Sequence, residues 1–394
     1  MLNVSVINPE FSNEEYSRRI LKLQEIIAKA KIDVLVCNNL SNICYLCGFQ
    51  TIGSYAYGLY SLIVPSKGQT TLFASNFESH NAKIDTWLDD IYVYDQSQEI
   101  TGTAAVSLAE LLIKKGFAKK NIGIETSHFS MTIQEYLEFK DHLNEAQIID
   151  STFILEDLKL IKSKEEIDAM EKSAKLSSVG MAAGINECRL NNTDNDIAAK
   201  IYDAIIKNGG EYFSLQPIVT TGERSGIPHS TFRRNILKKG DSGIIEVSAC
   251  YKRYSSPMMR TFCIGSPSDE VKYSFEACKD SIESIIFNLG PGVSGIKISN
   301  EAGKKIKAIK PDLMWHGFYG YSVGLGFPPA CSDVCKTGVI SEEKEFIPEA
   351  GMIFHINTTL RNIGKFAATC SETVLVTDNG CEVLTDLPRK LFIC

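Results

Sequence analysis

The sequence predicts an α/β domain followed by an α+β domain, and three observations support this fold class. The chain has 394 residues, more than one hydrophobic core ordinarily accommodates. In its first part, helical and strand-like segments alternate, as they do where helices cover a sheet. Further on, long amphipathic helices accompany pairs of neighbouring strands, which indicates helices packed on an antiparallel sheet. We therefore expect domains at residues 1–152 and 153–394.

The first domain is predicted to begin with a helix over residues 13–30. Ser12 and Glu15 form a capping box, and apolar residues follow at helical spacing. Strands are expected where short apolar runs occur, at residues 32–37, 91–94, 122–125 and 147–149, with a hairpin at 59–65 and 70–74. Further helical segments are expected near residues 42–49, 103–115 and 132–143.

A second capping box, Ser163 with Glu166, opens the second domain. One helix follows it, another begins at Thr193, and a third begins near residue 269. Strands are expected between and after these helices, at residues 243–251, 260–264, 352–357 and 373–377.

Composition excludes several classes of protein. The hydrophobic share is 44% and the charged share 23%, as in soluble globular proteins. A net charge of −7 speaks against a nucleic-acid partner, and no apolar run approaches the roughly 20 residues of a membrane span. The first residues do not resemble a signal peptide, and the twelve cysteines lack framework spacing, so we expect reduced thiols in a cytoplasmic protein.

Two side chains require an explanation. Glu246 lies in a predicted apolar strand between Ile245 and Val247, and a buried carboxylate is unfavourable unless it is paired or functional. His229 directly follows Pro228, ahead of that strand. The other histidines are read as ordinary core or surface residues, except that His316 and His355 lie closer to the motifs described next.

Several different short motifs are distributed along almost the whole chain. They are Leu158–Glu166, Pro228–His229, Lys239–Asp241, Arg260–Phe262, Gly320–Leu325, Ala350–Met352 and Ser371–Thr377. In this order and at these intervals the chain resembles the creatinase/aminopeptidase P/prolidase (pita-bread) family. The resemblance implies a creatinase N-terminal-like α/β domain and a pita-bread α+β catalytic domain.

Peptidases of this family bind two divalent cations through two aspartates, a histidine and two glutamates. The resemblance places these ligand positions, in chain order, on Glu246, Pro257, Tyr321, Asn357 and Ser371. Two divalent cations need several carboxylates or imidazoles, and this set contains one carboxylate. We therefore expect no metal and no other cofactor.

Two functions are compatible with the loss of the metal ligands. The chain could be a catalytically inactive binding module, or it could belong to the metal-independent branch of hydrolases represented by creatinase and, more similar in its motifs, ectoine hydrolase. The retention of His229, Glu246 and Glu372 favours the hydrolase. These three are the predicted catalytic residues, by similarity for His229 to the histidine on which creatinase relies. For Glu372 the alternative is a structural partner of an arginine.

Without a metal, water keeps a pKa of ~15.7 rather than ~7, so side chains must activate it or attack in its place. His229 can transfer a proton to a departing nitrogen. Glu246 can hold a cationic amidinium or guanidinium, act as a base toward water, or attack the carbon itself. Sequence alone does not distinguish these three roles.

The predicted substrate is a small zwitterion that also carries a carboxylate. Arg260 is the predicted substrate-binding arginine, with Arg253 and Arg224 as further candidates and a structural ion pair as the alternative for Arg260. Tyr254 and Tyr321 are further predicted substrate-binding residues, which either donate hydrogen bonds to the reaction centre or line it, with lining favoured for Tyr254. Tyr55 and Tyr57 belong to a first-domain loop which, by the resemblance, reaches the neighbour's pocket in a homodimer with a shared active site.

The expected function is metal-independent hydrolysis of a non-peptide C–N bond in a small zwitterionic amidine or guanidine, with ectoine as the single best substrate. A Xaa-Pro metallopeptidase and an inactive pita-bread module are the alternatives. The sequence does not identify the substrate.

Overall fold

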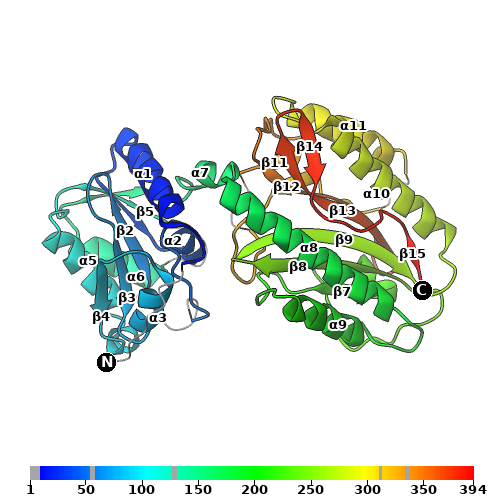
Figure 1. Cartoon of the computed structure of the whole chain (residues 1–394), viewed down its shortest axis with the longest axis horizontal. Coiled ribbons are helices and arrows are strands. Elements are labelled where there is room, and N and C mark those ends of the chain that lie inside the picture. The colour runs from blue at the N-terminus through cyan, green and yellow to red at the C-terminus, as the bar shows by residue number, and fades with distance from the viewer. Residues whose placement is uncertain (1–8, 54–57, 127–130, 310–312, 333–336) are drawn as a thin grey trace. The chain divides into compact units, whose positions relative to one another are not determined.

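The computed structural model describes residues 9–53, 58–126, 131–309, 313–332 and 337–394. The chain divides into two compact units, Met1–Leu158 and Lys159–Cys394. Figure 1 shows the helices and strands of each unit. No helix in the described ranges is both long and apolar enough to cross a membrane.

The first unit is a mixed six-stranded sheet with helices on it, which confirms the predicted α/β class. The strand order is β4-β3-β2-β1-β5-β6. The strands are β1 Val34–Cys37, β2 Ser61–Pro65, β3 Thr71–Ser75, β4 Ile91–Tyr94, β5 Asn121–Ile124 and β6 Gln147–Asp150. The helices are α1 Asn13–Lys29, α2 Leu40–Cys47, α3 Ser79–Asp85, α4 Ser97–Thr101, α5 Ala104–Lys114 and α6 Ile133–His142.

Local sequence explains the ends of α1. The Ser12 hydroxyl accepts a hydrogen bond from the backbone N–H of Glu15 (3.1 Å), so one free amide at the helix start is satisfied. The apolar stripe that includes Leu23 and Ile27 is fully buried. The predicted helix over residues 13–30 is thereby confirmed.

The second unit consists of two antiparallel sheets covered by helices, which confirms the predicted α+β class. One sheet has the order β11-β10-β12-β13-β14 and the other β15-β9-β8-β7. The strands are β7 Ile218–Thr221, β8 Ser242–Tyr251, β9 Tyr254–Cys263, β10 Phe318–Ser322, β11 Val339–Ser341, β12 Ile353–Asn362, β13 Phe366–Thr377, β14 Gly380–Val383 and β15 Phe392–Ile393. Among the strands described in this unit, only the short β15 pairs in parallel, with β9.

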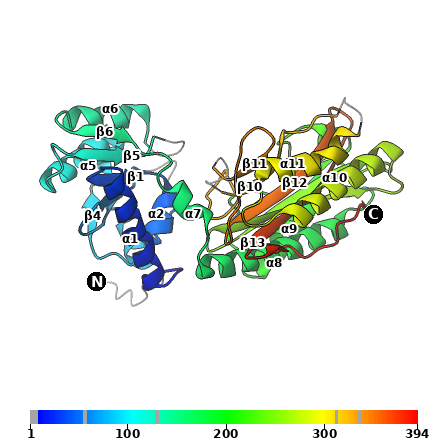
Figure 2. The ribbon, with the colours of Figure 1, turned by 90° about the horizontal axis from the view of Figure 1, so that it is seen from above.

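Two pairs of helices cover these sheets. Helices α8 (Lys164–Glu187) and α9 (Asp194–Lys207) pack with β8 and β9 around one apolar core. Helix α10 (Asp269–Asn288) lies along β12 and β13, and α11 (Gly295–Lys307) packs on α10, β10 and β11, around another core (Figures 1 and 2). The short α7 (Glu156–Leu160) precedes α8, and the 3₁₀ helix η1 (Gly222–Gly226) follows β7.

The two sheets meet where β13 packs on β9. The Thr261 hydroxyl donates to the Thr369 carbonyl (2.8 Å), and the Thr373 hydroxyl donates to the Pro257 carbonyl (2.7 Å). The long strands around this contact therefore turn polar side chains toward each other, while their opposite faces pack on helices. The candidate site lies on these inward faces.

Candidate active site

Glu246 is a buried carboxylate in the middle of β8. It pairs with Met259 of β9 on one side and Ile218 of β7 on the other. Its neighbours Ile245 and Val247 point into the core beneath α8 and α9, so the alternation of the strand turns Glu246 to the other face. Only 8% of its surface is exposed.

Few interactions compensate the negative charge of the Glu246 carboxylate. Within the described residues it accepts no hydrogen bond and forms no direct ion pair. Burial raises the pKa of this carboxyl to about 7, and the charge of nearby Arg361 opposes part of that rise. Glu246 is therefore poised between its charged and neutral forms near neutral pH, which suits a general acid or base.

Arg361 is the cation of the site, and sequence reasoning missed it. It lies near the end of β12, where Nη1 donates to the Ser225 carbonyl (2.8 Å). Burial lowers the pKa of Arg361 from its ordinary value, and Glu246 raises it. A period of two along β12 places Arg361 on the same face as Asn357 and His355, and that spacing could have identified it.

Two histidines lie near this pair. His316 is within 3.3 Å of Asn357, measured from ring Nε2 to Oδ1. Burial lowers the pKa of His316 to about 4; the Asn357 contact raises it, whereas the charges of Arg361 and His229 lower it further. His316 is thus a neutral imidazole at neutral pH, with His229 close enough to influence it.

His229, one of the predicted catalytic residues, is exposed and has a backbone φ of +53°. A left-handed conformation is uncommon for residues other than glycine and is found more often at functional sites. The segment after it is anchored by Arg224, whose Nη2 donates to the Ser230 hydroxyl (2.7 Å) and to the Thr231 carbonyl (2.9 Å). Arg224 thus holds the two residues that follow His229 in place.

A hydrogen-bonded chain joins three strands next to this cluster. His355 Nδ1 lies 2.8 Å from the Tyr321 hydroxyl, and its Nε2 lies 2.7 Å from the Ser371 hydroxyl. Burial lowers the pKa of His355 to about 3, and the charge of His316 acts in the same direction. A neutral imidazole has one donor and one acceptor, so one hydroxyl donates to the ring while the other accepts from it.

These contacts allow a test of whether the site fits two divalent cations. The five family ligand positions do lie on inward-facing strands: Glu246 on β8, Pro257 on β9, Tyr321 on β10, Asn357 on β12 and Ser371 on β13. Tyr321 and Ser371 both bind His355, and proline offers no side-chain donor. Within the described residues no cluster of three or more His, Cys, Asp or Glu could hold a metal ion. The donor set does not fit the two cations.

Glu372 and Arg260, predicted as catalytic and substrate-binding residues, instead bind each other. Arg260 Nη2 lies 2.7 Å from Glu372 Oε1, and both side chains are buried. The other Glu372 oxygen accepts from the Thr385 hydroxyl, and Arg389 lies 3.4 Å from Oε1. Arg260 also donates to four backbone carbonyls, those of Met259, Ser371, Leu387 and Pro388. This geometry supports the structural alternative for both residues.

The predicted tyrosines have different environments. The Tyr254 hydroxyl donates to Glu166 (2.7 Å), so this buried side chain secures the start of α8. Tyr321 is half-buried and belongs to the chain through His355. Tyr55 and Tyr57 lie outside the described residues. Arg253, a further candidate, is buried and donates to Ser214 (2.7 Å) and to the Tyr212 carbonyl (2.9 Å).

Comparison with known proteins identifies both units. The pattern of metallopeptidase family M24 matches residues 168–378, and that of the creatinase/prolidase N-terminal domain matches residues 19–161. Over 417 aligned residues the chain is 26% identical to the ectoine hydrolase of Halomonas elongata, covering 100% of both sequences. It is 25% identical to the Xaa-Pro dipeptidase of Pyrococcus furiosus, covering 95% of this chain and 99% of that one.

Solved structures agree on the fold. The prolidase of Thermococcus sibiricus superimposes with a TM-score of 0.84 at 25% identity, covering 97% of this chain and 100% of that one. The X-Pro aminopeptidase of Thermotoga maritima gives a TM-score of 0.81 at 21% identity, covering 95% and 99%. Relatives of similar identity thus include an enzyme named for ectoine and enzymes named for Xaa-Pro peptides.

Proposed function

The chain belongs to metallopeptidase family M24, and we propose that within this family it is a metal-independent hydrolase of a non-peptide C–N bond in a small zwitterionic amidine or guanidine. Ectoine is the proposed substrate. The observation on which the proposal depends is the arrangement of Glu246 and Arg361. Each influences the pKa of the other, yet they form no direct ion pair within the described residues.

A zwitterion complements this arrangement. A substrate carboxylate can bind the Arg361 guanidinium, because a planar fork of donors matches a carboxylate. A substrate amidinium can bind Glu246, whose negative charge it would compensate. Arg361 therefore replaces Arg260 as the proposed carboxylate anchor, since the Arg260 donors are taken up by Glu372 and backbone carbonyls.

The same arrangement supports hydrolysis. Water adds to the amidinium carbon, one C–N bond breaks, and the departing nitrogen receives a proton, so the sum is substrate plus one water. His229 is the proposed proton donor to that nitrogen. Glu246 either removes the proton from water or first attacks the carbon, in which case the C–N bond breaks to leave an O-imidoyl ester of Glu246 that water then hydrolyses to the amide.

The ligand positions and the relative's name support this proposal over a peptidase. A neutral peptide bond supplies no positive charge to compensate Glu246, and the donor set does not fit the metals that peptidases of the family use. The Halomonas relative carries the name ectoine hydrolase. The Xaa-Pro dipeptidase relative favours the competing function, so the test must include both substrates.

The experiment is a matrix of substrates and metal conditions. Purified protein is incubated with ectoine, creatine and a Xaa-Pro dipeptide, each with excess chelator and with added Mn²⁺, and products are separated by chromatography. Expected is ring opening of ectoine to an N-acetyl diamino acid at the same rate in chelator and in Mn²⁺. Chelator-sensitive cleavage of the dipeptide would restore the peptidase, and no turnover of any substrate would favour the binding module.

Matched variants connect turnover to the residues. Glu246→Gln and His229→Ala are expected to abolish ectoine opening. Glu223→Gln and His142→Ala change the same residue types at exposed positions and are expected to retain it. The proposal includes a homodimer in which the loop with Tyr55 and Tyr57 reaches the neighbour's site; Tyr57→Ala should then raise KM, and a light-scattering mass should equal two chains.

A further inference from the structure

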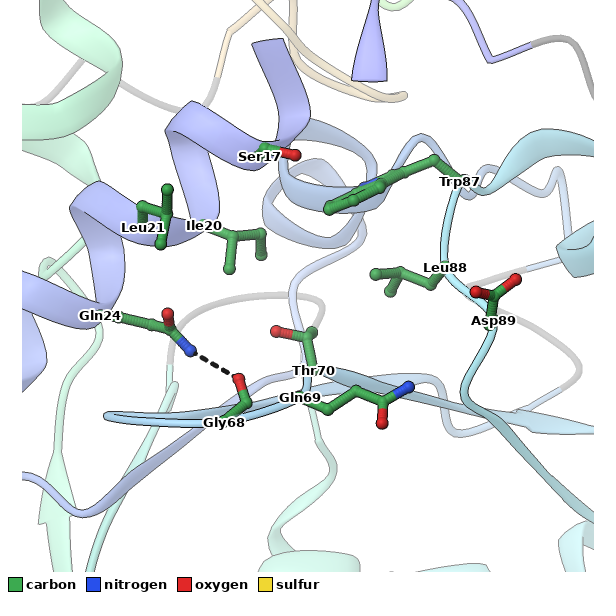
Figure 3. Close-up of a pocket in the computed structure, with 10 residues that line it drawn as sticks. All are labelled: Ser17, Ile20, Leu21, Gln24, Gly68, Gln69, Thr70, Trp87, Leu88 and Asp89. Atoms are coloured by element: carbon green, nitrogen blue, oxygen red, sulfur yellow. Dashed lines mark hydrogen bonds between the residues drawn. The ribbon is translucent and has the colours of Figure 1, made fainter. Parts of the chain in front are cut away.

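The first unit contains a cavity of about 350 Å³ whose lining includes none of the proposed catalytic residues (Figure 3). Three segments line it: α1, the turn between β2 and β3, and the loop after α3. The lining residues are Ser17, Ile20, Leu21, Gln24, Gly68, Gln69, Thr70, Trp87, Leu88 and Asp89. A volume of this size, with apolar walls and a few polar groups, is typical of a small-molecule site.

Thr70 supplies the first indication of a ligand. This residue is 4% exposed, and its hydroxyl has no hydrogen-bond partner in the described part of the chain. Figure 3 shows the side chain standing up from the hairpin into the space between α1 and Leu88. Buried hydroxyls are nearly always hydrogen-bonded, so Thr70 marks the place where a polar group of a ligand would bind.

Trp87 supplies an aromatic wall on the opposite side. Its ring is seen nearly edge-on above Leu88 in Figure 3, so a ring face is turned toward the cavity. Tyr16 stacks on the indole with centroids 6.3 Å apart, and Nε1 donates to the Leu46 carbonyl (3.4 Å). These contacts fix the ring, and because the indole N–H is already used, its π face is what it offers to a ligand.

Asp89 indicates that a ligand of this cavity would be positively charged. It is exposed at the rim and is the one charged residue among those that line the cavity. It forms no ion pair within the described residues. A cavity that offers a carboxylate at its rim and an indole face in its wall favours an organic cation, which gains from both the charge and the ring quadrupole.

We propose that this cavity binds a small alkylammonium compound that also carries a hydroxyl, with the ammonium group against Trp87 and Asp89 and the hydroxyl on Thr70. The site shares no residue with the proposed active site, and its existence does not depend on the proposed activity. Three features select the ligand: positive charge, an apolar body that fits between Ile20 and Leu88, and one hydrogen-bonding group.

The test uses the two tryptophans of the chain, Trp87 and Trp315. The protein is labelled with 5-fluorotryptophan, the two ¹⁹F signals are assigned with Trp87→Phe, and choline chloride is titrated against an equal concentration of sodium chloride. Expected is a saturable shift of the Trp87 signal with a Kd of about 1–10 mM, while the Trp315 signal from the second unit stays unchanged.

Two analogues, two variants and one control variant separate the contributions of the charge and the hydroxyl. Ethyltrimethylammonium, which lacks the hydroxyl, and the uncharged 3,3-dimethyl-1-butanol should each bind roughly five-fold more weakly than choline. Thr70→Val should weaken choline but not ethyltrimethylammonium, without lowering stability, because it removes an unpaired hydroxyl. Asp89→Asn should weaken both cations; Asp95→Asn, at another exposed position, should weaken neither.

The outcomes are decisive in both directions. A Trp87 shift that follows charge, hydroxyl and variants as stated supports the site. No Trp87 shift up to ~50 mM choline would overturn the proposal and would mean that water alone satisfies Thr70. Equal affinity of Thr70→Val and the parent for choline would equally overturn it.

Discussion

Two glutamates of the second unit each lie near an arginine, and their surroundings differ completely. Glu372 on β13 is bound by Arg260 at 2.7 Å and by Thr385. Glu246 on β8 accepts no hydrogen bond within the described residues, and Arg361 acts on it only through its charge. Both are buried carboxylates, so burial alone does not separate structural from functional groups. We propose that the number of hydrogen-bond partners does, with Glu372 structural and Glu246 catalytic.

The contrast explains why one arginine can serve a substrate and the other cannot. Arg260 donates to Glu372 and to four backbone carbonyls, and a substrate could bind it only by breaking these contacts. Arg361 has one side-chain hydrogen bond within the described residues, to Ser225. Its remaining donors are the ones that a carboxylate would use.

The largest expected effect concerns the stability of the Glu372 pair. Glu372→Gln should lower the free energy of unfolding by about 3–5 kcal/mol at pH 8, because it leaves the buried Arg260 charge uncompensated. Urea unfolding followed by Trp315 fluorescence in a Trp87→Phe background measures this in the second unit. A loss below ~1 kcal/mol, as for a surface pair, would show that the two glutamates do not differ in this way.

Glu246→Gln should show the opposite pattern. Turnover of ectoine should fall by roughly 10³-fold, about 4 kcal/mol in the activation barrier, while the free energy of unfolding at pH 8 is unchanged or higher. Glu223→Gln provides the exposed control. Retained turnover, or a stability loss like that of Glu372→Gln, would show that Glu246 has a structural role and not a catalytic one.

The pH dependence of stability sharpens the comparison. Because burial raises the pKa of Glu246 from 4.5 to about 7, the folded state binds its proton more tightly than the unfolded chain does. This contribution is fully present below pH 4.5 and is lost as pH rises to 7.

The stability difference between Glu246→Gln and the parent should therefore grow in favour of the variant by up to about 3 kcal/mol between pH 4.5 and 8. Unfolding curves across this range in both proteins give the difference, and Glu223→Gln should give a flat line. A flat line for Glu246→Gln as well would place the carboxyl in an ordinary, solvated environment.

The smallest effect is expected for Arg361→Lys. A lysine keeps the charge but loses the bidentate geometry, so KM for ectoine should rise about ten-fold, roughly 1.4 kcal/mol, with little change in kcat. Steady-state kinetics measures both. Arg224→Lys, beside His229, should affect kcat more than KM if its role is to position that segment.

Local patterns predicted the fold well, and long-range packing limited the rest. Capping boxes and apolar periodicity located α1, α8 and α9, and a short apolar run identified β8 and hence Glu246. Helix α11 was not predicted, although Ile298, Ala302 and Ile306 form its buried stripe, because several lysines and a Gly-rich start weaken the pattern. Strand β13 begins at Phe366 rather than near residue 373, since its first half is stabilised by pairing with β12.

The candidate site shows the same limit. The sequence singles out Glu246 and His229 as candidates, because the first is a charged residue within an apolar strand and the second belongs to a short motif. The sequence could not show which arginine lies next to which glutamate. That depends on how β13 packs against β9, and the two strands are more than a hundred residues apart in the chain. The chain from Tyr321 through His355 to Ser371 likewise requires three strands to be paired.

The central claim is that a single carboxylate, without two divalent cations, provides the chemistry at this site, and a calorimetric titration of metal tests it most directly. Mn²⁺ and Zn²⁺ are titrated into chelator-treated parent protein and into Glu246→Gln. The predicted result is no micromolar binding that differs between the two proteins. Binding of two ions per chain at micromolar concentration, abolished in Glu246→Gln, would contradict the claim.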